Sequence, residues 1–155
     1  MHAVSSLLDA ASSRKVEMLW KELEVRFGLK GIRVTPIPHF SWQIASHYDW
    51  VKAQLLLDEL AKDILPFTIK VAGLGLFTGT HPVLYLPLVK DRLVLEIHEL
   101  LWQTFDGLGQ EVSTHYHPDA WLPHITLAHS DITNENISEV TEMLAFRVFN
   151  WECSI

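Results

Sequence analysis

The sequence contains a single cysteine and few basic residues, and each of these shortages excludes a class of protein. Cys153 has no partner for an intramolecular disulfide and cannot build a cysteine-based metal site. Lys and Arg number 12 against 19 Asp and Glu, which gives a formal net charge of -7. Affinity for long nucleic acid comes from many clustered cationic side chains. We therefore expect no long duplex nucleic acid as a partner, and any nucleic acid that binds should be short or held at its end.

Long hydrophobic runs are absent as well. The apolar stretches of the sequence are far shorter than the ~20 residues that a membrane-spanning helix needs. No Lys or Arg precedes the short run Leu7-Leu8, and Asp9 follows it, so we expect no secretory signal peptide. A lone cysteine fits a reducing compartment. We therefore predict a cytoplasmic protein without a membrane partner.

The chain has 155 residues, of which 48% are hydrophobic, and this is enough to build one core. We expect a single domain over residues 1–155 and a monomer. Hydrophobic residues at helical spacing predict four helices, over about 9–27, 48–64, 91–105 and 134–144. Strands are predicted over 1–8, 32–35, 39–45, 67–77, 83–89, 122–128 and 147–153, the fourth and fifth of them joined as a hairpin.

One five-residue pattern occurs twice: proline, histidine, an apolar residue, a hydroxyl residue and a second apolar residue. The two copies are Pro38-His39-Phe40-Ser41-Trp42 and Pro123-His124-Ile125-Thr126-Leu127. Successive side chains of a strand point to opposite faces, so the histidine and the hydroxyl of each copy share one face. Each predicted strand therefore presents an imidazole beside a hydroxyl.

Both copies occupy the same place in a duplicated order of elements: strand, helix, motif strand, helix. This duplication predicts an α+β fold, a single bilobal domain with pseudo-two-fold symmetry, whose lobes cover roughly 1–65 and 66–155 and can exchange strands. Such symmetry would bring the motif strands together at the lobe junction, where ligand clefts are common. Two imidazoles and two hydroxyl donors across one cleft are suited to general acid–base attack on a phosphate ester.

Four side chains are therefore candidate catalytic residues. His39 and His124 can exchange protons with water, a sugar hydroxyl or a leaving oxygen, and each well-placed transfer contributes on the order of 10²- to 10⁴-fold. Ser41 and Thr126 are neutral donors that can hydrogen-bond the non-bridging phosphate oxygens. The two copies are nearly equivalent, so the sequence leaves open which imidazole is the base and which the acid.

Three aromatic residues near the motifs are candidates for binding a nucleobase by stacking. Tyr116 and Trp121 precede the second copy, and Tyr85 lies in the predicted hairpin. Packing in the core or at its rim is the alternative for each side chain, and it weighs more for Trp121 than for Tyr116.

The remaining histidines have weaker claims to a role. His115 and His117 could contribute to a metal site, but no third ligand stands at a supporting spacing, so we expect no metal. His98 lies on a predicted helix among acidic residues, and we expect it to face solvent. His129 follows the second motif strand and can support the site. Three basic residues that could contact phosphate are expected to be ordinary surface charges: Arg33, Lys70 and Lys90.

On its two motifs the chain resembles the two-histidine (2H) phosphoesterase superfamily, in the branch named after 2′-5′ RNA ligase. Members carry two copies of histidine, a hydrophobic residue, and threonine or serine, here His39-Phe40-Ser41 and His124-Ile125-Thr126. The resemblance covers nearly the whole chain. It implies a bilobal α+β domain whose antiparallel sheets line a central cleft, and reactions on cyclic or 2′-5′ phosphodiesters without metal or cofactor. Ser41 departs from the more usual threonine but keeps the hydroxyl.

The leading hypothesis is a metal-independent hydrolase that cleaves, or reversibly forms, cyclic or 2′-5′ phosphodiester bonds of RNA ends or nucleotides. One alternative is a cyclic phosphodiesterase for small nucleotides of the ADP-ribose type, which the negative net charge favours slightly. Another is a non-catalytic module that binds nucleotides or RNA ends. Two complete motif copies count against that module, because decay would be expected to remove an imidazole first.

Overall fold

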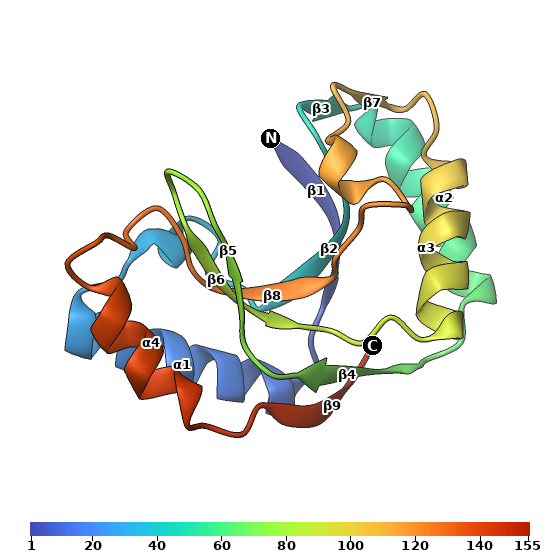
Figure 1. Ribbon diagram of the computed structural model, residues 1–155. Coiled ribbons are helices and arrows are strands. Elements are labelled where there is room, and N and C mark those ends of the chain that lie inside the picture. The colour runs from blue at the N-terminus through green and yellow to red at the C-terminus, as the bar shows by residue number, and fades with distance from the viewer.

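The four expected helices and most of the expected strands are present in the computed structural model, which describes residues 1–155 (Figure 1). The α-helices are α1 (Ala10–Phe27), α2 (Trp50–Asp63), α3 (Arg92–Thr104) and α4 (Ile137–Ala145). The strands are β1 (His2–Leu7), β2 (His39–Ala45), β3 (His47–Tyr48), β4 (Thr68–Ala72), β5 (Gly75–Phe77), β6 (Val83–Pro87), β7 (Gly109–Gln110), β8 (His124–Ala128) and β9 (Asn150–Ser154). Short 3-10 helices are η1 (Gly31–Val34) and η2 (Thr114–Tyr116). The predicted α+β class is confirmed.

The strands form four small antiparallel sheets. Their strand orders are β1-β2, β3-β7, β4-β9 and β5-β6-β8. The two motif strands, β2 and β8, belong to different sheets and lie next to each other in the middle of the molecule (Figure 1). One cluster of 31 buried hydrophobic residues includes members from both motif strands and all four helices. The motif strands therefore meet where the sheets share a core.

The helices do not stay with the strands that precede them in the chain. Helix α1 packs on β8 and α3 packs on β2, while α4 stands on the same side of the molecule as α1, and α2 on the same side as α3 (Figure 1). From α1, Trp20 reaches β8 and donates its indole N–H to the carbonyl oxygen of Thr126 at 2.9 Å. Helices are therefore exchanged between the two halves of the sequence, and strands of the two halves also pair, since β3 pairs with β7. The lobe bounds 1–65 and 66–155 stay a prediction.

The segment expected as a strand over residues 32–35 forms η1 instead. The backbone N–H groups of Lys30 and Gly31 both donate to the carboxylate of Asp131, a residue just beyond β8. These two hydrogen bonds fold the chain into a tight turn, which an extended strand could not make. The prediction for this segment was wrong because Asp131, the partner of Gly31, is 100 residues away in the sequence, and no local pattern shows such a contact.

The segment expected as one strand over residues 67–77 is interrupted. Gly73 has a φ of 92°, in the left-handed region that glycine adopts without strain. The part before it, β4, pairs with β9, and only β5 forms the expected hairpin with β6. One predicted strand therefore serves two sheets.

Asp9 ties the start of α1 to the last strand. Its carboxylate accepts hydrogen bonds from the backbone N–H groups of Ala11 and Ser12, at 2.8 and 2.9 Å, and from the Ser12 hydroxyl at 2.7 Å. It also accepts the N–H of Ser154 in β9 at 3.0 Å. These bonds, those from Ser12 above all, lower the pKa of Asp9 from 3.8 to about 2.

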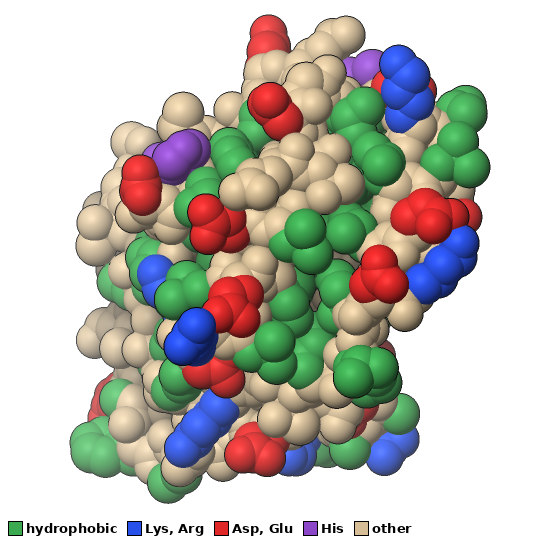
Figure 2. All heavy atoms as spheres, turned by 90° about the vertical axis from the view of Figure 1, so that its right-hand side faces the viewer, with side chains coloured by type: hydrophobic (Ala, Val, Ile, Leu, Met, Phe, Trp, Pro, Cys, Tyr) green, Lys and Arg blue, Asp and Glu red, His purple; other side chains and the backbone are tan.

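The outer side of α2 and α3 carries many apolar side chains, which Figure 2 shows gathered in the middle of that face. Ala53 is the only buried residue of α2. Trp50, Val51 and Leu55 of the same helix are all at least 50% exposed. A groove of about 320 Å³ with a mainly hydrophobic lining opens between α2, α3 and β1. None of the helices combines the length and the hydropathy that crossing a membrane would take.

Replacing Asp9 by alanine should destabilise the fold by about 1–2 kcal/mol, because the start of α1 loses its cap and β9 loses a tie. The loss should be measured by urea denaturation. The lowered pKa means that the carboxylate stabilises the fold above pH 3.8, and this contribution disappears as the pH falls through about 2. The difference in the free energy of unfolding between wild type and Asp9→Ala should therefore shrink in acid.

Asp49→Ala is the control. It removes an exposed cap that accepts one backbone hydrogen bond of 3.3 Å, from Lys52, and it should destabilise the fold less than Asp9→Ala does. Equal losses in the two variants would contradict this account.

Candidate active site

The motif strands alternate as the sequence predicted. His39 and Ser41 of β2 and His124 and Thr126 of β8 are partly exposed. The residues that follow each of them face the core and are almost fully buried: Phe40, Trp42, Ile125 and Leu127. Each strand thus presents one imidazole and one hydroxyl on one face and anchors itself by the other.

Both motif histidines are held by the same kind of backbone hydrogen bond. His39 Nδ1 lies 2.7 Å from the carbonyl oxygen of Ile37, and His124 Nδ1 lies 2.6 Å from that of Leu122. A carbonyl oxygen only accepts, so Nδ1 carries the proton in each ring. In the neutral ring the lone pair is then on Nε2, which no hydrogen bond within the chain engages. Both rings are therefore oriented with Nε2 available to exchange a proton.

The carbonyl oxygens of the two motif hydroxyl residues each accept a hydrogen bond from an indole. Trp121 Nε1 donates to Ser41 at 3.0 Å, and Trp20 Nε1 donates to Thr126 at 2.9 Å. Both tryptophans are buried. Leaving a buried carbonyl without a partner costs about 1–3 kcal/mol, so these bonds resist displacement of the backbone. The two hydroxyl residues are thereby fixed in matching ways.

The side-chain surroundings of the two hydroxyls differ. Ser41 Oγ lies 3.0 Å from Ser5 Oγ, on the neighbouring strand β1. Opposite Thr126, the register partner on β6 is Tyr85. The sequence did not point to Ser5, because the residue pattern of β1 or β2 does not show which other strand each of them pairs with.

A pocket of about 700 Å³ opens over the second motif strand. Its walls come from β8, the β5–β6 hairpin and the η2 segment, and its lining residues are Leu76, Phe77, Thr78, Val83, His115, Tyr116, Ala120, Leu122, His124, Thr126 and His129. The volume is typical of small-molecule sites, which span about 300–1,000 Å³. His39 and Ser41 are not part of this lining. The second motif therefore faces the pocket directly, and the first motif lies on the adjacent strand.

Of the aromatic residues expected to stack on a base, only Tyr116 lines the pocket. Tyr85 packs against other side chains: its ring centroid lies 4.1 Å from that of Phe77, in a stacked arrangement, and 5.2 Å from that of His124. Gly75 leaves room for the Tyr85 ring, because a Cβ at that position would come within 2.3 Å of it. Tyr85 thus supports His124 and Phe77 from outside the pocket lining.

Trp121 is completely buried, so the expectation that it stacks on a nucleobase is wrong. One neighbour of its ring is Trp42, at a centroid distance of 5.1 Å, and another is His98, at 3.8 Å. Trp121 is close to the second motif in the sequence, but its side chain belongs to the core. Its indole serves the backbone of the first motif instead.

His98 is also buried, with 1% of its surface exposed, and does not face solvent as expected. Its Nε2 lies 3.0 Å from the carbonyl oxygen of Trp42. Burial lowers the pKa of His98, and the hydrogen bond to Trp42 opposes this only in part. The spacing of Val94, Ile97 and Leu101 was the available signal, since it places His98 on the apolar side of α3.

Three lining residues were missed or given little weight. Phe77 meets the ring of His124 edge to face at a centroid distance of 5.0 Å. His129 Nδ1 lies 2.7 Å from the Ser130 hydroxyl, and His115 belongs to η2. The hairpin that carries Phe77 reaches β8 only in the folded chain, so no local pattern marks it. No three His, Cys, Asp or Glu side chains are grouped so that they could hold a metal ion.

His124 has a more enclosed environment than the sequence symmetry suggested. Burial lowers the pKa of His124; the hydrogen bond to the Leu122 carbonyl raises it, and the positive charge of His39 lowers it again. Phe77 and Tyr85 supply the nearby apolar surface. The neutral form of His124 is therefore favoured near neutral pH.

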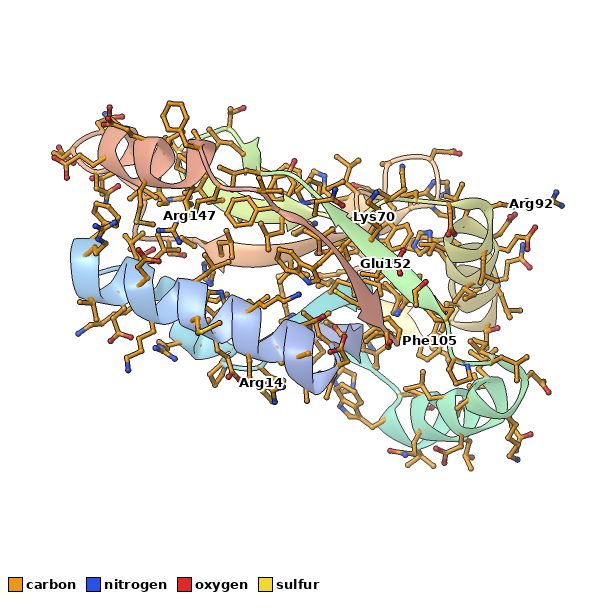
Figure 3. All side chains as sticks on the ribbon, turned by 90° about the horizontal axis from the view of Figure 1, so that it is seen from below. Arg14, Lys70, Arg92, Phe105, Arg147 and Glu152 are labelled. Atoms are coloured by element: carbon orange, nitrogen blue, oxygen red, sulfur yellow. The ribbon has the colours of Figure 1, made fainter.

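The three basic residues that sequence reasoning considered for phosphate binding have other surroundings. Arg33 pairs with Glu24, with Nη2 and Oε2 2.6 Å apart. Lys90 Nζ donates to a backbone carbonyl at 2.9 Å. Lys70 of β4 is the register partner of Glu152 of β9, on the lower side of the molecule that Figure 3 shows. None of them lines the pocket.

Adjacent motif strands that each present an imidazole and a hydroxyl, in an α+β domain, are the arrangement of a two-histidine phosphoesterase. The family model of the 2′-5′ RNA ligase superfamily matches residues 12–155. The chain therefore belongs to this superfamily, within the 2H phosphoesterases, and the resemblance seen in the two motifs is confirmed. No curated protein matches the chain. The superfamily acts on phosphodiester bonds of RNA and nucleotides.

Titration of the histidines followed by NMR should show that His124 loses its proton below 6.5, its ordinary pKa. The His39→Gln variant should raise the pKa of His124, since one positive charge is removed, but should leave it below 6.5 because burial remains. A control variant, His81→Gln, replaces an exposed histidine outside the pocket lining and should leave His124 unchanged. A His124 pKa at or above 6.5 in the wild type would contradict the enclosed environment.

Proposed function

We propose that this chain is an enzyme that cleaves cyclic or 2′-5′ phosphodiester bonds of nucleotides or RNA ends by acid–base catalysis between His39 and His124. The observation that carries the proposal is the matched Nδ1 hydrogen bond of the two rings, which leaves both Nε2 atoms available. Membership in the superfamily supports the substrate class. The charge of His39 also lowers the pKa of His124, which supports an interaction between the two rings.

In this mechanism His124 is the base, because its lowered pKa keeps the ring neutral. Its Nε2 accepts a proton from water while the water oxygen forms a bond to phosphorus. The protonated His39 donates its Nε2 proton to the leaving sugar oxygen as the P–O bond breaks. A phosphate monoester results, and the two rings have exchanged protonation states. A sugar hydroxyl in place of water would form a new phosphodiester by the same two transfers.

Ser41 and Thr126 donate hydrogen bonds to the non-bridging oxygens, whose negative charge grows as the pentavalent state forms. Ser5 orients the first of these donors: when the Ser5 hydroxyl donates to Ser41 Oγ, the Ser41 hydroxyl proton is free for phosphate. The indole hydrogen bonds to the two carbonyl oxygens keep the backbone beneath both hydroxyls in place. Preorganised donors of this kind lower the barrier because they need no rearrangement during the reaction.

The pocket over β8 receives the nucleoside part of the substrate. Phe77 and Tyr116 provide aromatic surface in its lining, and stacking on such surface contributes roughly 1–3 kcal/mol per base. His124 and Thr126 lie in the same lining, so a base held there leaves its phosphate close to the second motif.

The test is turnover of 2′,3′-cyclic nucleotides, 2′-5′ dinucleotides, RNA with a cyclic phosphate end and an ADP-ribose cyclic phosphate, all with EDTA present. His39→Ala and His124→Ala should each lower kcat by about 10²-fold or more, and the double variant should be little worse than either one. Near-wild-type turnover by both single variants would refute the assignment. Binding without turnover would favour the non-catalytic module, and recovery of lost activity by zinc or manganese would favour a metal enzyme.

The hydroxyl residues should behave differently from the histidines. Ser41→Ala and Thr126→Val should lower kcat by roughly 10- to 10³-fold, the range of a lost oxyanion donor. The pH profile of kcat should stay in place, because neither hydroxyl titrates near neutral pH. Thr141→Val, on α4 and outside the pocket lining, is the matched control and should retain full activity. A displaced pH profile in Ser41→Ala or Thr126→Val would instead implicate that hydroxyl in proton transfer.

A further inference from the structure

His98 is a buried titratable residue that no step of the proposed reaction uses. It lies on α3, and its Nε2 is 3.0 Å from the carbonyl oxygen of Trp42, the residue after Ser41 in the first motif strand. The backbone of Tyr116, in the pocket wall, also acts on the ring by raising its pKa. One imidazole on α3 therefore contacts the backbone of the first motif strand.

The same ring stacks on Trp121, with centroids 3.8 Å apart and planes inclined by 14°. Trp121 lies three residues before His124, and its Nε1 donates to the carbonyl oxygen of Ser41. This indole ties the chain that leads into the second motif to the backbone of the first. Lys90 Nζ donates to the carbonyl oxygen of Trp121 at 2.9 Å and holds that backbone as well.

The stack continues to Trp42, whose ring centroid lies 5.1 Å from that of Trp121. Trp42 Nε1 donates to the hydroxyl of Ser6, on β1, at 2.9 Å. The three rings of His98, Trp121 and Trp42, with the hydrogen bond that each one makes, form what we call the aromatic brace. The brace joins β1, β2, α3 and the segment that leads into β8.

We propose that His98 is a positioning residue which, through the aromatic brace, holds the two motif strands in the relative position that proton transfer at one phosphate requires. The inference rests on the proposed function, since it concerns the alignment of His39 with His124. A displacement of about 1 Å at reacting groups can cost on the order of 10²-fold in rate, so a small movement of one strand suffices. His98 is itself too buried to touch a substrate and acts through Trp42 and Trp121.

The neutral form of His98 serves this role. The Trp42 carbonyl only accepts, so Nε2 carries the single proton of the neutral ring. Burial lowers the pKa of His98, and the charges of Lys90 and His117 act in the same direction, against the carbonyls of Trp42 and Tyr116. The lowered pKa favours the neutral ring, whose Nε2 donor is directed at β2.

The test compares His98→Gln with His98→Leu. Glutamine places an N–H donor at about the reach of Nε2, whereas leucine has a similar volume and no donor. On the substrate that the wild type cleaves, His98→Leu should lower kcat at least about tenfold with KM changed less than about threefold. His98→Gln should remain within about threefold of the wild-type kcat, as rescue by a conservative variant requires.

Trp121→Phe tests the brace from its other side, because it keeps an aromatic ring and removes the donor to Ser41. It should show the same loss of kcat at nearly constant KM. The double variant with His98→Leu should be no slower than the slower single variant, since both act through one unit. Trp151→Phe is the matched control: its indole N–H bonds neither motif strand, and its kcat should be unchanged.

Thermal unfolding monitored by circular dichroism shows which variants are folded. If His98→Leu does not fold, the kcat of Trp121→Phe is compared with that of the wild type instead. Wild-type kcat in the folded variants that lack a donor would overturn the inference. Equal impairment of His98→Gln and His98→Leu would overturn it too, as would losses that multiply in the double variant.

A second readout does not depend on turnover. In folded His98→Leu or Trp121→Phe, the NMR-measured pKa of His124 should move up toward 6.5, because a loosened junction admits water to the ring. An unchanged His124 titration would count against the brace. If the wild type cleaves none of the phosphodiesters, the proposed function fails, while this titration still decides whether the brace positions His124.

Discussion

The position of two backbone carbonyl groups, those of Ser41 and Thr126, is the constraint on which the candidate site depends. Each accepts a hydrogen bond from a buried indole, and the two indoles come from outside the strand that they hold. Such a bond is hard to exchange for water, because both partners would have to leave the core together. The imidazoles and hydroxyls of the two motifs are therefore attached to backbone that these hydrogen bonds hold in place.

Beneath this shared backbone geometry, the two motif copies have different neighbours. His124 is enclosed by Phe77 and Tyr85 and lines the pocket, whereas the first motif has Ser5 at its hydroxyl and lies outside the lining. Burial in apolar surroundings disfavours a charged imidazole. The asymmetry therefore favours the neutral form of His124. The duplicated motif thus provides two groups with the same backbone geometry and different packing.

The exchange of helices between the two halves has a mechanical consequence. Because α1 packs on β8 and α3 packs on β2, each motif strand rests on a helix from the other half of the sequence. Trp20 from α1 and His98 from α3 make this relation specific, since each hydrogen-bonds the backbone of the strand that its helix covers. The halves cannot separate without opening the core, so the relative position of the motif strands is a property of the whole domain.

The sequence by itself determined the local elements and the family. The four helices, the alternation in both motif strands and the family all follow from patterns that neighbouring residues carry, because periodicities of 3.6 and 2 residues are local. Contacts across long separations were decided only by the tertiary structure. Asp131 turned an expected strand into η1, β1 brought Ser5 beside Ser41, and the core absorbed Trp121 and His98. Each of these outcomes depends on which elements pack together, and that choice is made by the burial of the entire hydrophobic surface rather than by any one segment.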